Sequence, residues 1–300
     1  MRFQHGASAI DESTVFIDDS SDVTFSDNVI AMNNWGGLLI LASSNISIFG
    51  TTVNENGGRG IVASRVTGLL LADNETSRNN WRGAPAGYVE WSASGLKVLL
   101  IHGGAIVNHL SEDNQASGIW LDTDNKDVTL DGIVSRGNLT DGLILEANQG
   151  PVLVINSMIA DNGRWGISSL NSIGLSVVDS HFCDNSESQI RIRNQTEART
   201  VRDWETQETL ALPPASGWEF SRNVVVSDAS NAVLFGIASG TYQEQFIATL
   251  NSDGNVWHGR GSANLFTLGD GMRLDLNEWQ LLTGQDANSA AEKPKQSCTR

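Results

Sequence analysis

Short apolar stretches alternate with polar turns along most of the chain. An asparagine recurs near the end of each unit, and a glycine that opens the next strand recurs beside it. The asparagines are Asn34, Asn56, Asn80, Asn114, Asn138, Asn162 and Asn185, with intervals of 22, 24, 34, 24, 24 and 23 residues. The glycines are Gly37, Gly60, Gly83, Gly118, Gly142 and Gly166, and their intervals lengthen at the same place. Self-similarity of this kind predicts a repeat architecture with a period near 23 residues and one insertion.

Each unit reads as three short strands separated by turns. An example is Gly118-Ile-Trp-Leu-Asp122, followed by Val128-Thr-Leu130 and then Ile133-Val134. At about 3.3 Å per residue, one unit closes a coil of three strands, and successive coils pair in parallel at about 4.8 Å. The pattern predicts an all-β fold, a single-stranded right-handed parallel β-helix, in which the asparagines form a hydrogen-bonded ladder at one turn.

The repeat divides the chain into parts of different regularity. We expect regular coils over residues 1–195 with an excursion at 84–95, an irregular connection at 196–217, further C-terminal coils at 218–287 and a polar tail at 288–300. Insertions in solenoids project on one face and often border the binding surface. Strand-like stretches within the C-terminal coils are predicted at 223–226, 232–235, 245–250 and 255–257.

Composition and charge narrow the classes of partner. Hydrophobic residues make up 40% of the chain and charged residues 18%, so the chain can bury a core. With 19 Lys and Arg against 35 Asp and Glu, the net charge of -16 repels polyanions, so we expect no nucleic-acid or membrane partner. The same field favours neutral glycans over polyuronates. Two cysteines, Cys183 and Cys298, permit one disulfide without establishing that they pair.

Two carboxylates occupy the same phase of adjacent units. Alternation of inward and outward side chains in the segment 118–122 points Trp120 and Asp122 outward, and in 142–146 it points Glu146 outward. Each carboxylate lies four residues after the glycine that opens its strand, so we expect them side by side on neighbouring coils. A separation of about one strand spacing is close to the roughly 5–5.5 Å between the carboxyl groups of a retaining glycosidase. One of the two pKa values is expected to rise, as a general acid requires.

Further side chains are candidates for substrate binding. Lys97 lies about one coil before Asp122, where it would either bond a sugar hydroxyl, lower the pKa of the nucleophile, or form a salt bridge to Asp122 or Glu90. Trp120 would either stack on a sugar face or cover the edge of the coil. Glu90 and Trp91 border the site if the excursion folds over it, and otherwise close the excursion.

The sequence predicts no resident metal or other cofactor. The five histidines show no metal-ligand spacing, so no zinc site is expected. Asp124 follows Asp122 on the outward face if the strand continues, so Asp122, Asp124 and Glu146 could instead hold Ca²⁺ through hard oxygens, under an alternative in which the protein is a lyase. A lyase also needs a basic side chain and a means of neutralising a uronate carboxylate, and Lys97 alone meets this need in the sequence.

Three segments resemble secreted right-handed β-helix proteins of the pectin-lyase-like superfamily. They are residues 90–97, 118–122 and 143–152, and their pattern is similar to that of the glycoside hydrolase family 120 β-xylosidases. This resemblance, which covers roughly residues 88–165, implies that Asp122 is the nucleophile and Glu146 the acid/base. Thr123 follows Asp122 where that family would have an aromatic residue. The resemblance therefore indicates where the site lies and does not indicate which sugar the protein binds.

The favoured hypothesis is a carbohydrate-active β-helix, a retaining glycoside hydrolase on neutral, xylan-type glycosides, whose partner is a poly- or oligosaccharide. Two alternatives stay open: a glycan-binding or structural β-helix without turnover, and a Ca²⁺-dependent polysaccharide lyase. An extracellular or periplasmic location is expected from the resemblance, although the opening residues 1–5 do not begin a signal peptide. The sequence specifies no oligomeric state.

Overall fold

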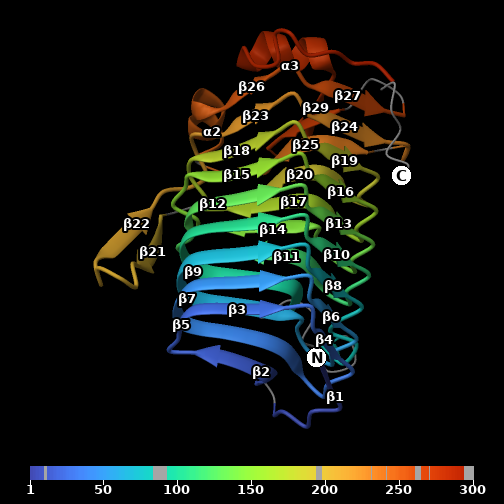
Figure 1. The fold of residues 1–300 in the computed structure, drawn as a ribbon. Helices are drawn as coiled ribbons and strands as arrows, with labels where there is room; N and C mark the ends of the chain where they lie inside the picture. The colour runs from blue at the N-terminus through green and yellow to red at the C-terminus, as the bar shows by residue number, and fades with distance from the viewer. Residues whose placement is uncertain are drawn as a thin grey trace.

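The main body of the protein is a stack of coils whose strands run parallel to one another. Figure 1 shows the stack, with the N-terminal coils at one end and the C-terminal segments closing the other. The strands of each coil belong to three faces, which we call the first, second and third face. Because each strand pairs in parallel with its counterparts in neighbouring coils, the predicted parallel β-helix is confirmed. The computed structural model describes residues 1–9, 12–83, 93–193, 198–230, 232–240, 242–260, 265–269 and 271–293.

The first and second faces share three long strands that bend around the edge between them: β5 (Gly36–Phe49), β7 (Ile61–Ala72) and β9 (Ser94–Val107). The first face continues with β2 (Ser13–Asp18), β11 (Ser117–Leu121), β14 (Leu143–Glu146), β17 (Trp165–Leu170), β20 (Ser188–Ile192), β25 (Val233–Ile237) and β28 (Phe266–Leu268). The second face continues with β3 (Ser21–Ser26), β12 (Lys126–Asp131), β15 (Val152–Ile155), β18 (Leu175–Val178), β23 (Glu219–Ser221) and β26 (Asn251–Asp253).

The third face is a sheet in which each strand pairs in parallel with the next coil. Its strands are β1 (Arg2–Gln4), β4 (Val29–Ala31), β6 (Thr52–Asn54), β8 (Glu75–Ser77), β10 (Leu110–Glu112), β13 (Val134–Arg136), β16 (Met158–Ala160), β19 (His181–Cys183), β24 (Val224–Ser227) and β27 (Val256–Gly259). Cys183 on this face is buried and disulfide-bonded, and Cys298 lies outside the described residues.

The core lies inside the coils, where alternate side chains of every strand meet. Ile119 of β11 pairs with Leu143 of β14, and Leu121 pairs with Leu145. All four side chains are fully buried, as the alternation predicts. A fully buried aliphatic side chain stabilises the fold by about 1.5–3 kcal/mol relative to an exposed one. This packing fixes which residues of β11 and β14 point outward.

A buried asparagine ladder runs along the turn that precedes the first face. Each Nδ2 donates to the Oδ1 of the next coil's asparagine at 2.8–3.1 Å, and the same Oδ1 accepts the backbone N–H of the preceding asparagine. The ladder therefore satisfies turn groups that water cannot reach. Its members are Asn33, Asn56, Asn79, Asn114, Asn138, Asn162 and Asn185.

Two members predicted from the sequence are wrong by one residue. The chain has an Asn-Asn pair at both places, and the residues whose amides join the ladder are Asn33 and Asn79, in place of Asn34 and Asn80. The observed intervals of 23, 23, 35, 24, 24 and 23 residues are more regular than the predicted ones. Regular spacing is a physical requirement, because a one-residue slip would move the amide out of reach of its neighbours.

The repeated glycine that opens each first-face strand has a steric cause. A Cβ at Gly118 would lie 2.6 Å from Asn138 Nδ2 and 2.8 Å from the carbonyl oxygen of Gly142. Any side chain there would displace the ladder. The prediction of Gly83 in the glycine series is wrong, because β9 begins at Ser94 and Gly95 takes this place, beside Asn114 Nδ2 and the carbonyl oxygen of Gly118. With Gly95 in its place, the asparagine and glycine series report one packing arrangement.

The C-terminal part departs from the predicted coils in two places. The segment predicted as a strand at 245–250 is mostly helix α2 (Gln243–Thr249), which buries Phe246 against Trp218 at 5.8 Å between ring centroids. Gln, Glu and Ala favour helix in this segment, and the apolar pattern alone did not separate a short helix from a strand. The connection predicted as irregular at 196–217 contains an antiparallel hairpin of β21 (Arg199–Arg202) and β22 (Thr209–Leu212).

The insertion between β8 and β9 is shorter than predicted at its C-terminal end. Strand β9 begins at Ser94, so the last residues of the predicted excursion at 84–95 belong to the coil. Residues 84–92 lie outside the described part of the chain.

Helix α3 (Leu276–Thr283) closes the C-terminal end of the core. It begins with a capping box between Asp275 and Glu278. Trp279 stacks on Phe266 at 4.7 Å between ring centroids, and its Nε1 donates to Asp286 Oδ2 at 2.9 Å. The parallel stack ends just before this helix, because β29 (Met272–Leu274) pairs antiparallel with β28. A flat aromatic side chain thus covers the open end of the solenoid.

The ladder gives a prediction about stability. Asn138→Ala should lower the free energy of unfolding by about 1–3 kcal/mol, because it leaves buried groups of Asn114, Asn162 and Ser111 without their partner. Urea denaturation measures this change. Asn34→Ala is the matched control, since Asn34 is only half-buried and lies outside the ladder. Equal losses in the two variants would contradict the assigned role of the ladder.

Candidate functional site

Asp122 and Glu146 lie side by side on the first face. The register pairs Trp120 with Ile144 and Leu121 with Leu145, so the next residue of each strand brings the two carboxylates onto neighbouring coils. Each carboxylate side chain keeps 16% of its surface exposed. The adjacency predicted from the glycine spacing is confirmed, and their catalytic roles stay a prediction.

Lys97 is the nearest cation to Asp122. It lies on β9, opposite Trp120 in the register, and its Nζ is 2.8 Å from Asp122 Oδ2. The same ammonium lies 3.6 Å from the centroid of the Trp120 ring. Of the contacts considered for Lys97, the structure contains the salt bridge to Asp122. Trp120 is 9% exposed, so its ring is largely covered and one of its contacts is with Lys97.

The surroundings of Asp122 favour its carboxylate form. Burial alone raises the pKa of Asp122, but the charge and hydrogen bond of Lys97, with further bonds from Thr123, outweigh it and lower the pKa below its usual value. Thr123 donates from its backbone N–H at 2.7 Å and from Oγ1 at 3.0 Å. Asp122 is therefore not the carboxyl in which the expected rise in pKa occurs. An ionised carboxylate is the form that a nucleophile needs.

Glu146 is paired with a cation that the sequence did not indicate. Its Oε1 accepts a hydrogen bond from Arg199 Nη1 on β21. The hairpin is held there by a small apolar cluster in which Val201 and Leu212 pack against Ala147, directly after Glu146. Arg199 lies 53 residues after Glu146 in the segment predicted as an irregular connection, so no local pattern pointed to it.

Asp124 does not continue the outward row. It lies in the turn after β11 with a positive φ of 60° and is fully buried, which corrects the expectation that it shares a face with Asp122. Burial raises the pKa of Asp124, and the charge of Asp203 raises it further, against hydrogen bonds from Gln149 and His102. His102 Nε2 lies 3.4 Å from Asp124 Oδ2.

The three carboxylates of the proposed Ca²⁺ set face different partners. Asp122 contacts Lys97, Glu146 contacts Arg199, and Asp124 contacts His102 and Gln149. Glu90 and Trp91, the other predicted binding residues, lie outside the described residues.

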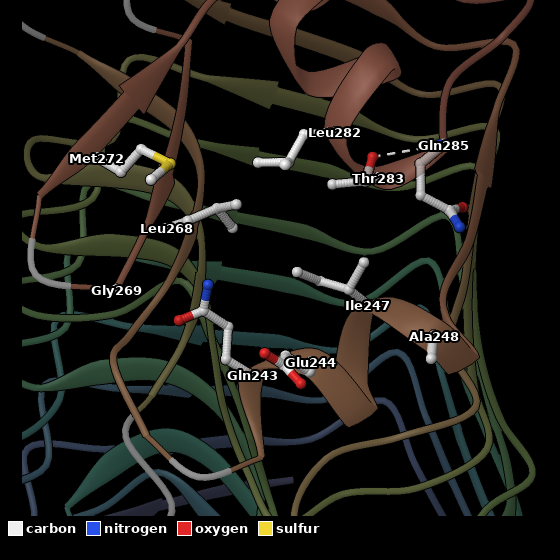
Figure 2. A pocket seen from close by; sticks show the side chains of 10 residues that line it. All are labelled: Gln243, Glu244, Ile247, Ala248, Leu268, Gly269, Met272, Leu282, Thr283 and Gln285. Carbon is white, nitrogen blue, oxygen red and sulfur yellow. Dashed lines mark hydrogen bonds between the residues drawn. The ribbon is translucent and has the colours of Figure 1, made fainter.

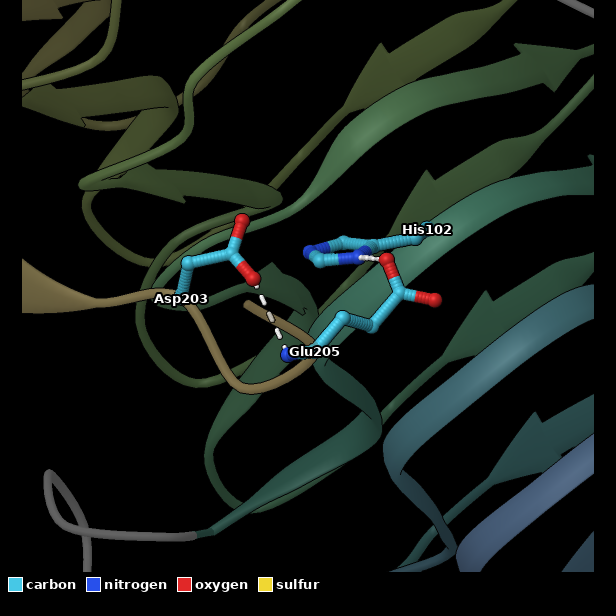
Figure 3. Close-up of side chains that lie close together, drawn as sticks. All are labelled: His102, Asp203 and Glu205. Atoms are coloured by element: carbon cyan, nitrogen blue, oxygen red, sulfur yellow. Dashed lines mark hydrogen bonds and ion pairs between the residues drawn. The ribbon is translucent and has the colours of Figure 1, made fainter. Parts of the chain in front are cut away.

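A separate cluster lies where the tip of the β21–β22 hairpin meets the second face. Figure 3 shows His102 of β9 facing Asp203 and Glu205, which follow β21. His102 Nδ1 hydrogen-bonds to Glu205, and Lys126 Nζ lies 2.8 Å from Asp203 Oδ2. The hairpin therefore spans several coils, from Glu146 on the first face to Thr67 on β7, whose Oγ1 donates to Glu205 at 3.1 Å.

A cavity of about 910 Å³ lies away from these residues, between helices α2 and α3 and the β28–β29 hairpin (Figure 2). Its lining is largely apolar and includes none of the sequence-predicted site residues. The lining residues are Gln243, Glu244, Ile247, Ala248, Leu268, Gly269, Met272, Leu282, Thr283 and Gln285. With one carboxylate, Glu244, it offers no pair of acidic groups for the predicted chemistry.

Comparisons with known proteins identify the family. A model of the right-handed β-helix region matches residues 13–203, more than half of the chain, so the protein belongs to the right-handed β-helix family. The predicted handedness is thereby confirmed. No match was found among curated proteins. Among the described residues, no helix is both long and apolar enough to cross a membrane.

Solved structures with the same fold include two epimerases. A double mutant of the periplasmic alginate epimerase AlgG is 19% identical with a TM-score of 0.52, and the match covers 82% of this chain and 47% of that one. The A-module of the Azotobacter vinelandii mannuronan C-5 epimerase AlgE6 is 12% identical with a TM-score of 0.56, covering 98% and 81%. The chain thus spans about half the length of AlgG. At these sequence identities the similarity shows a shared fold and nothing about activity.

The Lys97–Asp122 pair gives a prediction about protonation. In Lys97→Gln the pKa of Asp122 should rise above the wild-type value, because burial, which raises it, is then opposed only by Thr123. A ¹³C NMR titration of the aspartate carboxyls measures the change, and Lys126→Gln, which removes the partner of Asp203, serves as the control.

The same pair sets a pH dependence of stability. Since the folded-state pKa of Asp122 is lowered, the pair stabilises the fold above the usual carboxyl range, and this contribution is lost as the pH falls through the lowered pKa. Wild type and Lys97→Gln should therefore differ more in unfolding free energy at neutral pH than in acid. An Asp122 pKa that is unchanged by Lys97→Gln would refute both expectations.

Proposed function

We propose that this protein is a carbohydrate-active enzyme, a retaining glycoside hydrolase on neutral, xylan-type glycosides. The observation that carries the proposal is the register of β11 and β14, which brings Asp122 and Glu146 together on the outside of the solenoid. Adjacent parallel strands lie about 4.8 Å apart, and retaining enzymes hold their two carboxyl groups about 5–5.5 Å apart. Inverting enzymes hold the two groups about 6.5–9.5 Å apart, which is wider than the spacing of adjacent strands.

In the proposed reaction Asp122 is the nucleophile. Its carboxylate, kept ionised by Lys97 and Thr123, attacks the anomeric carbon and forms a glycosyl ester. Glu146 gives a proton to the departing glycosidic oxygen. It then takes a proton from the water that attacks the ester, which releases the sugar with its original anomeric configuration and restores both carboxyl groups.

The Arg199 contact imposes a condition on this cycle. Arg199 occupies Glu146 Oε1 with a hydrogen bond, whereas in the proposed reaction Glu146 must give its proton to the leaving oxygen of the substrate. The proposed reaction therefore requires Arg199 to leave Glu146 when the glycan binds. Arg199 is on a hairpin that stands beside the coils, so it can exchange a protein carboxylate for substrate oxygens without disturbing the core (Figure 1).

A second candidate function is favoured by the two cations on these carboxylates. Elimination or epimerisation of a uronate needs a base and a cation that neutralises the sugar carboxylate, and Lys97 and Arg199 could fill these roles. The structural relatives named above are an alginate epimerase and a mannuronan C-5 epimerase according to their names, and their likeness supports the fold alone. Binding of a glycan without turnover is the third outcome. For each of them we expect an extracellular or periplasmic site of action.

The hydrolase proposal is tested with aryl glycosides, including β-xyloside and α-arabinofuranoside, and with xylan oligosaccharides. Asp122→Asn should abolish turnover on all of them. Glu146→Gln should lower turnover about 10²–10⁴-fold on oligosaccharides and less on aryl glycosides, whose leaving groups need little protonation. NMR of the first-formed product should give retention of configuration.

Glu112→Gln is the matched control, because Glu112 forms an arginine ion pair with Arg136 on the third face. It should leave turnover unchanged. Unsaturated sugar ends released from a uronate polymer would transfer the assignment to the second candidate. The enzyme proposal would be wrong if the protein bound oligosaccharides but released no product from any of these substrates.

A further inference from the structure

We propose that His102, Asp203 and Glu205 form a binding site for a divalent metal ion of the zinc class, which fastens the β21–β22 hairpin to the coils. One ligand atom from each of the three residues lies within 4.8 Å of the other two. His102 comes from β9 in the solenoid, and the two carboxylates come from the turn of the hairpin (Figure 3). The site is separate from Asp122 and Glu146 and does not depend on the function proposed for them.

The size and donors of this cluster fit such an ion. Three atoms that lie within 4.8 Å of one another all lie within about 2.8 Å of a common point, and zinc bonds to imidazole and carboxylate are about 2.0–2.2 Å. Each ligand atom therefore has to move by less than about 1 Å. Glu205, whose side chain is 40% exposed, can make such a movement freely. One imidazole among the donors selects zinc-class ions over Ca²⁺ and Mg²⁺, which prefer all-oxygen sites.

The surroundings of His102 support metal binding at Nδ1. Metal-ligating histidines usually donate their other ring N–H to a carboxylate, which fixes the tautomer. Here Nε2 faces Asp124, which is fully buried, and Gln149 donates to the other oxygen of Asp124. The Trp204 ring lies 5.5 Å from the His102 ring and shields it. The imidazole is thus held with Nδ1 toward the hairpin carboxylates.

Both carboxylates are also oriented by groups around them. Asp203 Oδ1 accepts the backbone N–H groups of Glu205 and Thr206 at 2.9 Å each, while Lys126 holds Oδ2. Glu205 accepts from Thr67 at 3.1 Å. A carboxylate oxygen has more than one lone pair, so these bonds leave acceptor capacity for an ion. The ligands are positioned in advance, and little ordering is needed on binding.

The formal charges of the cluster leave room for a divalent cation. Asp124, Asp203 and Glu205 bring three negative charges, and Lys126 brings one positive charge. A metal-bound imidazole is neutral, so the remaining formal charge is about -2. A divalent ion balances it. Without a metal, the same contacts are hydrogen bonds of His102 to Glu205 and Asp124, and this is the alternative that the experiment must separate.

The position of the hairpin links this site to Glu146. The hairpin has Arg199 near one end, on Glu146, and the metal ligands at its turn. An ion at the turn would join β9 to the hairpin and hold it across the coils. Metal binding would then be measurable as protection of the hairpin, whether or not the protein has catalytic activity.

The test is calorimetric titration of the metal-free protein with Zn²⁺, with Ca²⁺ titrated separately. We expect one Zn²⁺ per chain and much weaker binding of Ca²⁺. His102→Gln and Glu205→Gln should each weaken Zn²⁺ binding at least about tenfold, and Asp124→Asn about 10–100-fold through the imidazole. His181→Gln, a half-buried histidine on the third face, should bind Zn²⁺ as wild type does.

Limited proteolysis gives a second readout. Zn²⁺ should slow tryptic cleavage after Arg202 in the wild type, and a chelator should restore it, whereas Glu205→Gln should be cleaved equally with and without Zn²⁺. Glu205 is exposed enough for this variant to fold, so the test does not depend on His102→Gln. A wild type that binds no Zn²⁺, or variants that bind it as tightly as wild type, would overturn the proposal and leave the hydrogen bonds of His102 to Glu205 and Asp124 as the explanation of the cluster.

Discussion

The phase of each coil relative to the next is the constraint on which the rest of the structure depends. In a parallel β-helix a shift of one residue between neighbouring strands would exchange inward and outward side chains along the whole strand. The buried asparagine ladder prevents such a shift, because its Nδ2 and Oδ1 atoms meet only when every coil turns at the same residue. The glycine that opens each first-face strand leaves the space that the amide occupies.

This phase also creates an electrostatic problem on the first face. Two carboxylates in register on adjacent strands repel each other, and in a chain with a net charge of -16 the surroundings do not relieve the repulsion. The structure places one cation on each. Lys97 comes from the preceding coil, where it lies opposite Trp120 in the register, whereas Arg199 comes from a hairpin outside the repeat. The two cations that offset the carboxylate charges differ in their surroundings. Lys97 is buried in the site, whereas Arg199 is more exposed and lies on a hairpin outside the repeat.

Much of the fold could be predicted from the sequence, because the repeat is a local property. Intervals between glycines and asparagines predicted the coils, and alternation within β11 and β14 predicted that Asp122 and Glu146 share the outer surface. The errors fall where the local signal is ambiguous. An Asn-Asn pair allowed two phases at positions 33 and 34, and helix α2 has an apolar pattern that a strand of the same length could also have.

The contacts of the hairpin could not be predicted, because they join residues far apart in the chain. Arg199 meets Glu146 across 53 residues, and Glu205 meets His102 across 103. Such pairs leave no spacing in the sequence, so the five histidines gave no sign of a metal-ligand arrangement. Both contacts depend on one short antiparallel hairpin. If the turn of the hairpin is fastened to β9, the same element that holds Arg199 on Glu146 is anchored to the second face. The contacts of Glu146 on the first face are then coupled to a site on the second face.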